Sequence, residues 1–526
     1  MIQSPAQLAR RWSQHGSADR FLAANLSIGL GHFLVLFNGG AYLPMIPKVA
    51  GSLGCNPGYG DWTQDLYFLG LGLAFPLAPW LRSRLGDRGG LLLAFALFAV
   101  ASALNALSTQ YGWFLFARIL AALAGGLTIP LSLSLLLSHY HAEGKSRGLF
   151  LWGWASITPF AFGPFLGGLL ADTWGWRWLF ILDVPLTLLV FLGIWFWEEP
   201  DQDHPAFAMD WLGYAFLAIT LSSAVMFLNF WDIDGWWDST RNELLLLLCL
   251  LAALALLLWS WPHRHSIIDL RLLRRRNFAL AALGILLSGL FFQGTLAVLV
   301  VLYQLQFGFS AYRIGVLLLP MALLAPVSAA FSHWYLRRHD PRWLGVVAML
   351  LLSVSAFWMA SWALPVSPDM LCWPPLLVGL GLGALFGVWA RIGLWGLAAT
   401  EELRAASLLN LLRSSGQALG IPITAVFWAR RSILHRHFLI QDPQQQHLAW
   451  NAALQRFSPL LTPAGAQAQL ADLLGQQAAM LAFNEVFTVA GWGFLALAAL
   501  SLFVGHPIAS AEPMSEQMAI AEMVEP

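Results

Sequence analysis

Long apolar runs separated by short polar turns make up most of the chain. An α-helix needs about 20 mainly apolar residues to cross the roughly 30 Å hydrocarbon core of a bilayer. Runs of this kind recur along the whole sequence, which predicts an all-α polytopic membrane protein. We place fourteen transmembrane helices near residues 24–46, 62–81, 90–108, 112–138, 148–171, 178–197, 210–230, 243–261, 278–302, 313–336, 343–363, 373–397, 406–428 and 482–505.

Positive charge between the runs predicts the orientation. With the N-terminus inside, seventeen Lys and Arg residues fall on the cytoplasmic side and eight on the outer side. Cytoplasmic loops of membrane proteins carry an excess of Lys and Arg, so this assignment is favoured. Because the number of predicted spans is even, we expect both termini to be cytoplasmic.

The composition narrows the class of protein further. Of the 526 residues, 58% are hydrophobic and 11% are charged, and the formal net charge is zero, so no nucleic-acid partner is indicated. The three cysteines lie far apart without metal-ligand spacing, and we expect no metal site and no cofactor. A G-x-x-x-x-G-K-[ST] loop is absent, which argues against an ATP-driven pump. No predicted span holds a His/Glu metal pair, which disfavours a membrane enzyme.

A weak internal repeat divides the chain. Gly416 and Gly420 echo Gly163 and Gly167, and paired halves with a binding site between them are a transporter design. The one long connection contains Ala466–Ala482, which is rich in Ala, Leu and Gln and is expected to be helical. We expect an N-terminal six-helix bundle, a two-helix insertion, a C-terminal six-helix bundle, an extracytoplasmic loop and a disordered tail at residues 1–200, 201–265, 266–428 with 482–507, 429–481 and 508–526.

One small-residue pattern stands out in the fifth predicted span. Gly163 and Gly167 lie four residues apart and share a helix face, which lets a second backbone approach closely. Pro164 removes a backbone donor and favours a bend. Ordinary packing of membrane helices explains this spacing, and so does a pivot between two moving bundles. Gly163, Pro164, Gly167 and Gly168 are therefore candidates for a conformational motif.

Six stretches together resemble one family. Gly-Pro-x-x-Gly-Gly at 163–168 looks like the antiporter motif of the major facilitator superfamily. A basic turn at 82–88, with Arg84, Gly86 and Arg88 as further candidates for the conformational motif, resembles the turn after that family's second helix. The order and spacing of all six resemble the fourteen-helix drug:proton antiporter branch, and within it the EmrB type, over nearly the whole chain. The remaining four are Arg118 with Ile129–Ser132, Trp176–Phe180 with Asp183–Pro185, Ile268–Leu272 with Arg276–Phe278, and Arg413 with Ser414, Gly416 and Gly420.

The resemblance implies a fold and a function. It implies the major facilitator fold, as six, two and six helices, in the inner (cytoplasmic) membrane of the cell. It also implies a secondary active transporter that exports amphipathic drugs or toxic compounds in exchange for protons. Its partners would be the small-molecule substrate, protons, the lipid bilayer, and a periplasmic adaptor protein with an outer-membrane channel. An importer or solute antiporter on the same fold, and a non-transporting scaffold or sensor, stay open as alternatives.

Two departures from the family pattern concern proton coupling. The family usually has an Asp in helix 1 where this chain has Asn38, and a usual Asn is replaced here by Asp183. The resemblance therefore supplies no proton carrier in helix 1, and other acids must be considered.

Ionisable residues inside predicted spans are the candidates, because each costs about 2.5–3.5 kcal/mol on insertion scales. Asp65 and Arg118 differ in predicted depth by about 5 Å, which long side chains can bridge. We expect these two to pair, and we assign proton coupling to Asp65 and Arg118, with Asp183 as the second acid. A structural ion pair for Arg118, or contact of Asp65 with water near a helix end, would explain them without transport.

Further residues are candidates for a substrate cavity. A fixed positive charge at Arg391 would favour weakly acidic hydrophobic substrates, although a structural ion pair would explain it equally. Arg413 lies about two turns from the inner end of its span, where snorkelling to the interface explains it. A packing role explains His32. The candidates for the cavity are His32, Asn38, Tyr303, Gln304, Trp389 and Arg391.

Overall fold

The computed structural model describes residues 18–139, 145–199, 207–231, 236–262, 266–397, 399–440 and 462–505, and these are helical without a strand. The expected tail at 508–526 lies outside the described residues. The α-helices are α2 (Ala18–Ala41), α3 (Ile46–Ser52), α4 (Pro57–Gly60), α5 (Trp62–Ala74), α6 (Ala78–Leu107), α7 (Tyr111–Ser138), α8 (Lys145–Thr173), α9 (Arg177–Trp197), α10 (Trp211–Trp231), α11 (Thr240–Ser260), α12 (Arg276–Leu305), α13 (Ala311–Leu317), α14 (Leu319–Leu336), α15 (Pro341–Ala360), α16 (Trp373–Gly393), α17 (Ala399–Ile440) and α19 (Pro463–Leu502).

Each predicted span coincides with helical structure, which confirms the all-α prediction. Among the described residues, eleven helices are long and apolar enough to cross a membrane, or twelve if the bent pair α13–α14 is one span. One of the eleven, Trp62–Leu107, is 46 residues long and contains two predicted spans. Another predicted span lies in α17, which is not among the eleven. Fourteen spans remain a prediction with which these helices agree.

Glycine and proline set the breaks between helices. Gly86 interrupts α6 with a φ of 73°, a left-handed conformation that glycine adopts without steric cost. This break lies in the predicted basic turn, between two predicted spans. α13 and α14 meet at an angle of 44°, and Pro320 lies in the first turn of α14. Proline cannot donate the hydrogen bond that would continue α13 without interruption.

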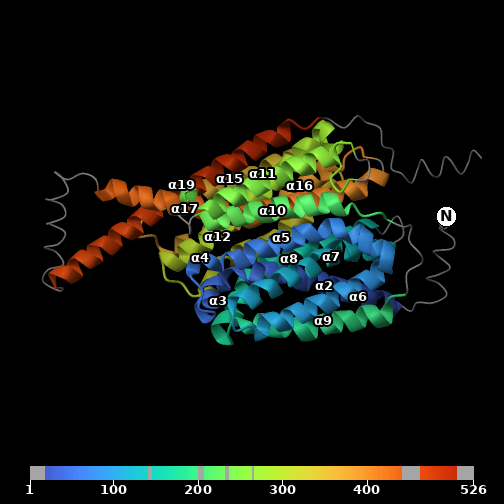
Figure 1. The fold of residues 1–526 in the computed structure, drawn as a ribbon, viewed down its shortest axis with the longest axis horizontal. Helices are drawn as coiled ribbons and strands as arrows, with labels where there is room; N and C mark the ends of the chain where they lie inside the picture. Colours follow the sequence, from blue (N-terminus) through green and yellow to red (C-terminus); the bar gives the residue numbers. More distant parts are fainter. Residues whose placement is uncertain are drawn as a thin grey trace, which may run out of the picture.

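The long helices pack as two sets that lie side by side (Figure 1). In the first set, α2 and α5–α9 pack on one another, and in the second set α12–α17 and α19 do. α10 and α11 pack together, and α10 also contacts α5 of the first set and α17 of the second. Contacts between the sets run mainly from α8 to α13 and α14, and from α5 to α17. α8 and α17 are thus the helices through which each set reaches the other.

Two helices are much longer than a bilayer requires. α17 has 42 residues and α19 has 40, whereas a span needs about 20. Figure 1 shows their far ends projecting beyond the other helices, on the side of α3 and α4. The helix predicted at Ala466–Ala482 is confirmed as part of α19. Residues 441–461 of the predicted outer loop lie outside the described part of the chain.

Candidate functional site

The glycine pair of α8 brings that helix into backbone contact with α2. A Cβ atom on Gly163 would lie 2.5 Å from the backbone nitrogen of Ala41, and one on Gly167 would clash with the Ala41 carbonyl. Gly40 of α2 approaches the Phe160 carbonyl just as closely. No larger residue fits at these positions without separating the helices. We call this contact the first glycine seam; it lies within the first helix set.

The next glycine of the motif faces the other set. A Cβ on Gly168 would clash with the carbonyl of Ala311 in α13. In return, one on Gly315 would lie 2.6 Å from the Pro164 carbonyl and from the Phe165 Cα. The motif therefore lies at a contact between the two helix sets. Its role in movement stays a prediction.

The basic turn lies at the break in α6. Asp87 forms an ion pair with Arg82 at 3.2 Å and accepts a hydrogen bond from Ser134 of α7 at 2.8 Å. Arg88 donates to the Trp195 carbonyl of α9 at 2.6 Å. Arg84 is exposed. The turn therefore joins three helices of the first set.

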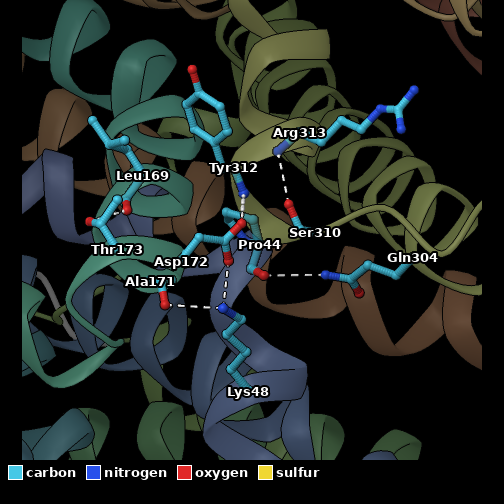
Figure 2. Close-up of polar contacts among 10 residues, drawn as sticks. All are labelled: Pro44, Lys48, Leu169, Ala171, Asp172, Thr173, Gln304, Ser310, Tyr312 and Arg313. Carbon is cyan, nitrogen blue, oxygen red and sulfur yellow. Dashed lines mark hydrogen bonds and ion pairs between the residues drawn. The ribbon is translucent and has the colours of Figure 1, made fainter.

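Polar contacts join the two sets where α8 ends and α13 begins, which we call the Asp172 end (Figure 2). Lys48 donates to the Asp172 carboxylate at 2.5 Å and to the Ala171 carbonyl at 3.0 Å. The other carboxylate oxygen of Asp172 accepts the backbone N–H of Tyr312 in α13 at 2.9 Å. Asp172 therefore joins α8 to Lys48 of α3 and to Tyr312 of the second set.

Two residues predicted for the cavity lie at this end instead. Gln304 donates to the Pro44 carbonyl at 3.2 Å, which adds a second hydrogen bond between the sets. Tyr303 is fully buried and donates to the Leu371 carbonyl at 2.7 Å. Neither lines the cavity described below.

Arg118 lies at the centre of a buried polar network in the first set. It is fully buried and donates to the side-chain oxygen of Asn38 in α2 and, at 3.3 Å, to Gln64 in α5. Its guanidinium lies 4.1 Å from the Tyr42 ring centre and 4.3 Å from that of Tyr67, close enough for cation–π attraction.

Asn38 connects this arginine to a buried acid. Its amide nitrogen donates to the Asp183 carboxylate of α9 at 2.5 Å, while its oxygen accepts from Arg118. Ser102 of α6 lies beside the same carboxylate. Asp183 is 2% exposed, so the acid and the arginine share one buried network through a neutral amide. The proposed proton-coupling residues Arg118 and Asp183 are thereby brought together.

Asp65 lies elsewhere, and the expected pairing with Arg118 is wrong. Its neighbours are Asp61 and Asn229 of α10, and among the described residues no ion pair joins it to Arg118. The reason is rotation about the helix axis. Adjacent helical residues point about 100° apart, so Gln64 faces Arg118 while Asp65 faces α10. The sequence estimate compared only the depths of the two residues.

A cavity lies between the two sets. Its walls are mainly apolar, with Phe68 and Phe75 from the first set, Phe160 from α8, and Leu382 and Phe386 from α16. The polar side chains that line it are Tyr67, Ser156, Arg413, Ser414 and Gln417. A mainly apolar lining with a few polar groups is typical of a small-molecule site.

None of the six predicted cavity residues lines this space, but His32 touches its wall. His32 is fully buried, stacks on Trp152 with ring centres 4.4 Å apart, and shares a 2.5 Å hydrogen bond with the cavity residue Ser156. The two candidates on α16 do not line the cavity, although Leu382 and Phe386 of the same helix do. Trp389 is buried against α12 and donates to Ser288 at 2.9 Å, while Arg391 is exposed.

The charge that does face the cavity comes from α17. Arg413 lines the cavity. The expectation that its side chain snorkels to the membrane interface is therefore wrong. Residues 382 and 386 share one face of α16, whereas 391 lies on another face and in the last turn. A helical-wheel comparison of the polar residues in each span could have identified Arg413 and Gln64. Lys48 and Asp172 lie too far apart in sequence for any such signal.

Two sets of membrane helices, a cavity between them and a contact that closes one end define a helical membrane transporter. The family model of the Major Facilitator Superfamily matches residues 28–421, and the chain belongs to this superfamily.

Proteins similar to the chain include two bacterial export proteins and one solved transporter structure. It is 26% identical over 489 residues to the Multidrug export protein EmrB of Escherichia coli (strain K12), covering 92% of this chain and 95% of that protein. The Multidrug export protein EmrB of Haemophilus influenzae is 26% identical over 496 residues, with the same coverage. A bacterial homolog of the human lysosomal transporter Spinster, solved in an inward-facing and occupied conformation, shares the fold with a TM-score of 0.62 at 14% identity, over 95% of this chain and 100% of that one.

Proposed function

We propose that the protein exports amphipathic, toxic small molecules across the cytoplasmic membrane in exchange for protons. The observation that carries this proposal is the largely apolar cavity between the two helix sets, together with the buried acid and arginine beside it. The similarity to EmrB multidrug export proteins over 92% of the chain supports export and a broad substrate range.

The two sets act as the two halves that rock about the cavity. Gly168 and Gly315 let α8 and α13 touch at the Asp172 end, and Asp172 and Gln304 add hydrogen bonds between the sets. With the N-terminus cytoplasmic, this is the outer end, so the conformation described is closed to the outside. Release of the substrate then requires these contacts to separate.

Asp183 is the proton carrier in this proposal, and Arg118 senses its charge. The Asn38–Asp183 hydrogen bond is strengthened while the carboxylate is ionised, since charged acceptors make stronger hydrogen bonds. Protonation of Asp183 removes that negative charge. Arg118 is then a cation in the network without a negatively charged partner. The packing of α2, α7 and α9 is thereby linked to the protonation of one side chain.

Resistance of cells tests the export function. An efflux-deficient host that carries the protein is grown on a panel of toxic amphipathic compounds, beside the same host with Gly167→Leu. We expect the wild-type chain to raise the inhibitory concentration of several compounds and the variant to raise none. Compounds that accumulate in the wild-type cells instead of leaving them would favour the importer.

The long outer hairpin of α17 and α19 serves as the docking site for a periplasmic adaptor protein, which links export to an outer-membrane channel. Its projection beyond the other helices supports this assignment. Arg431 and His435 of α17 bond to Glu485 of α19 and hold the base of the hairpin. Replacing residues 441–461 with a short Gly/Ser linker leaves that base intact. We expect transport in vesicles to continue and resistance of cells to disappear, whereas equal loss of both would indicate a role in folding.

A further inference from the structure

The cavity holds one charged side chain among the described residues that line it, and this is Arg413. Its Nε is enclosed without a hydrogen-bond partner in the described part of the chain. The Phe386 ring lies 5.6 Å from the guanidinium carbon. By contrast, Arg118 in the first set has Asn38 and Gln64 as acceptors.

An enclosed guanidinium without a counter-ion is unfavourable in a membrane protein. Arg118 meets this cost with its own network, but the described chain provides no such partner for Arg413. An anion that enters the cavity from outside would supply the missing acceptor. Guanidinium groups match the geometry of carboxylate and sulfonate oxygens, which they bind with two parallel hydrogen bonds.

The rest of the cavity defines the remainder of the ligand. Gln417 lies one helical turn from Arg413 and adds amide donors near the guanidinium, and Ser414 lies next to it in sequence. Phe68, Phe75 and Phe160 form much of the apolar wall. A molecule that matches this lining has one anionic head and an apolar or aromatic body.

We propose that this cavity binds amphiphilic monoanions, with the anionic group on Arg413 and the apolar body between the aromatic walls. The inference that such compounds are exported rests on the proposed function, whereas their binding does not. The proposal assigns the charge preference to α17, where the sequence had suggested Arg391 of α16.

Equilibrium dialysis of the full chain in phosphatidylcholine nanodiscs tests the proposal. The probes are the anion 1-anilinonaphthalene-8-sulfonate and the cation tetraphenylphosphonium, and binding to empty nanodiscs is subtracted. We expect the anion to bind at least about tenfold more tightly than the cation, because a hydrogen bond to a charged group has that strength. Equal affinity for both probes would overturn the proposal.

Substitutions of Arg413 test whether this residue causes the preference for the anion. Arg413→Gln should weaken binding of the anion about tenfold and leave the cation unchanged, and Arg413→Lys should keep part of the preference because it keeps the charge. Arg391→Gln is the matched control, since that arginine is exposed, and it should bind like the wild-type chain. An unchanged anion affinity in correctly folded Arg413→Gln would contradict the proposal, and Arg413→Lys serves if Arg413→Gln does not fold.

Two further experiments separate a soluble ligand from a lipid head group, and binding from transport. Nanodiscs with phosphatidylglycerol test whether an anionic lipid head group is the natural occupant; loss of anion binding there would overturn the assignment to a soluble amphiphile. Anion-selective binding without proton-driven transport would refute the proposed function and leave the binding proposal standing. Proton-driven export of several compounds, together with equal affinity of the chain for the two probes, would support the proposed function and refute the binding proposal.

Discussion

α8 and α17 occupy equivalent places in the two helix sets, but they differ in what they present to the centre of the molecule. Each packs on the first long helix of its own set through a glycine pair: Gly163 and Gly167 of α8 meet α2, and Gly416 and Gly420 of α17 meet the Leu286 and Leu290 carbonyls of α12. Three residues before each pair, a side chain lines the cavity. This residue is Phe160 in α8 and Arg413 in α17.

The helices also differ in how they reach the opposite set. α8 has a third glycine, Gly168, which admits α13 at the Asp172 end. The equivalent position of α17 is the buried Ile421. α17 instead contacts α5 beside the cavity, where a Cβ on Gly72 would lie 3.1 Å from the Ser414 Cβ. The repeat therefore preserves packing within each half, while α8 makes the contact at the Asp172 end and α17 places a charged side chain in the cavity.

The largest loss of transport is expected from substitutions in the glycine pairs that α8 and α17 share. Gly167→Leu and Gly420→Leu should each abolish transport. Overpacking costs about 1–3 kcal/mol or more, and a leucine at either position would force the two packed helix backbones apart. Gly153→Leu on α8 is the control, since no atom lies within 4 Å of its added Cβ. Transport is measured in vesicles alongside the amount of inserted protein. Normal transport by both Gly167→Leu and Gly420→Leu would show that the repeated glycine pairs are not needed for transport.

A second prediction separates the two buried acids. Asp183→Asn should reduce proton-driven accumulation to the level of empty vesicles and preserve exchange of labelled for unlabelled substrate. Asp65→Asn should retain accumulation, because Asp65 faces α10 and is not joined to Arg118 among the described residues. The reverse pattern would restore Asp65 as the carrier.

A smaller, partial effect is expected from exchanging two side chains. Asn38 and Asp183 contact each other, and each departs from the residue usual in the family. The double variant Asn38→Asp, Asp183→Asn returns the acid to α2 and should recover transport to within about tenfold of wild type, since coupling between touching residues is about 0.5–3 kcal/mol. No recovery over Asp183→Asn alone would show that the carboxylate must lie on α9.

The smallest effect concerns the Asp172 end. The side chain of Lys48 is 43% exposed, and exposed ion pairs contribute about 0–1 kcal/mol. Asp172→Asn keeps an acceptor for Tyr312 and should therefore increase opening at this end by at most about fivefold. The rate of thiol labelling of Ala311→Cys, a buried position that packs on Gly168, reports opening when Cys55 and Cys372 are replaced by Ser. A much larger increase would mean that the ion pair, and not the glycine contact, holds this end closed.

Much of the fold followed from the sequence because a membrane imposes helix length and composition on each span. The glycine pairs were also recognisable, since spacing alone places them on one face. Polar partners were harder to predict. Depth along a helix is readable from sequence, but rotation about its axis decides that Gln64 and not Asp65 meets Arg118. Likewise, Arg413 and not Arg391 faces the cavity, because neighbouring helices set which side of α16 and α17 is covered.

Exchange of substrate for protons is the central claim, and one measurement tests it directly. Proteoliposomes that hold the full chain and an enclosed pH dye are given a proton gradient, and movement of a compound identified by the resistance panel is recorded together with internal pH. We predict that protons move against the direction of the compound in wild type, and that Asp183→Asn stops both movements driven by the gradient. Gradient-independent flux of the compound, with no opposite flow of protons, would contradict the account.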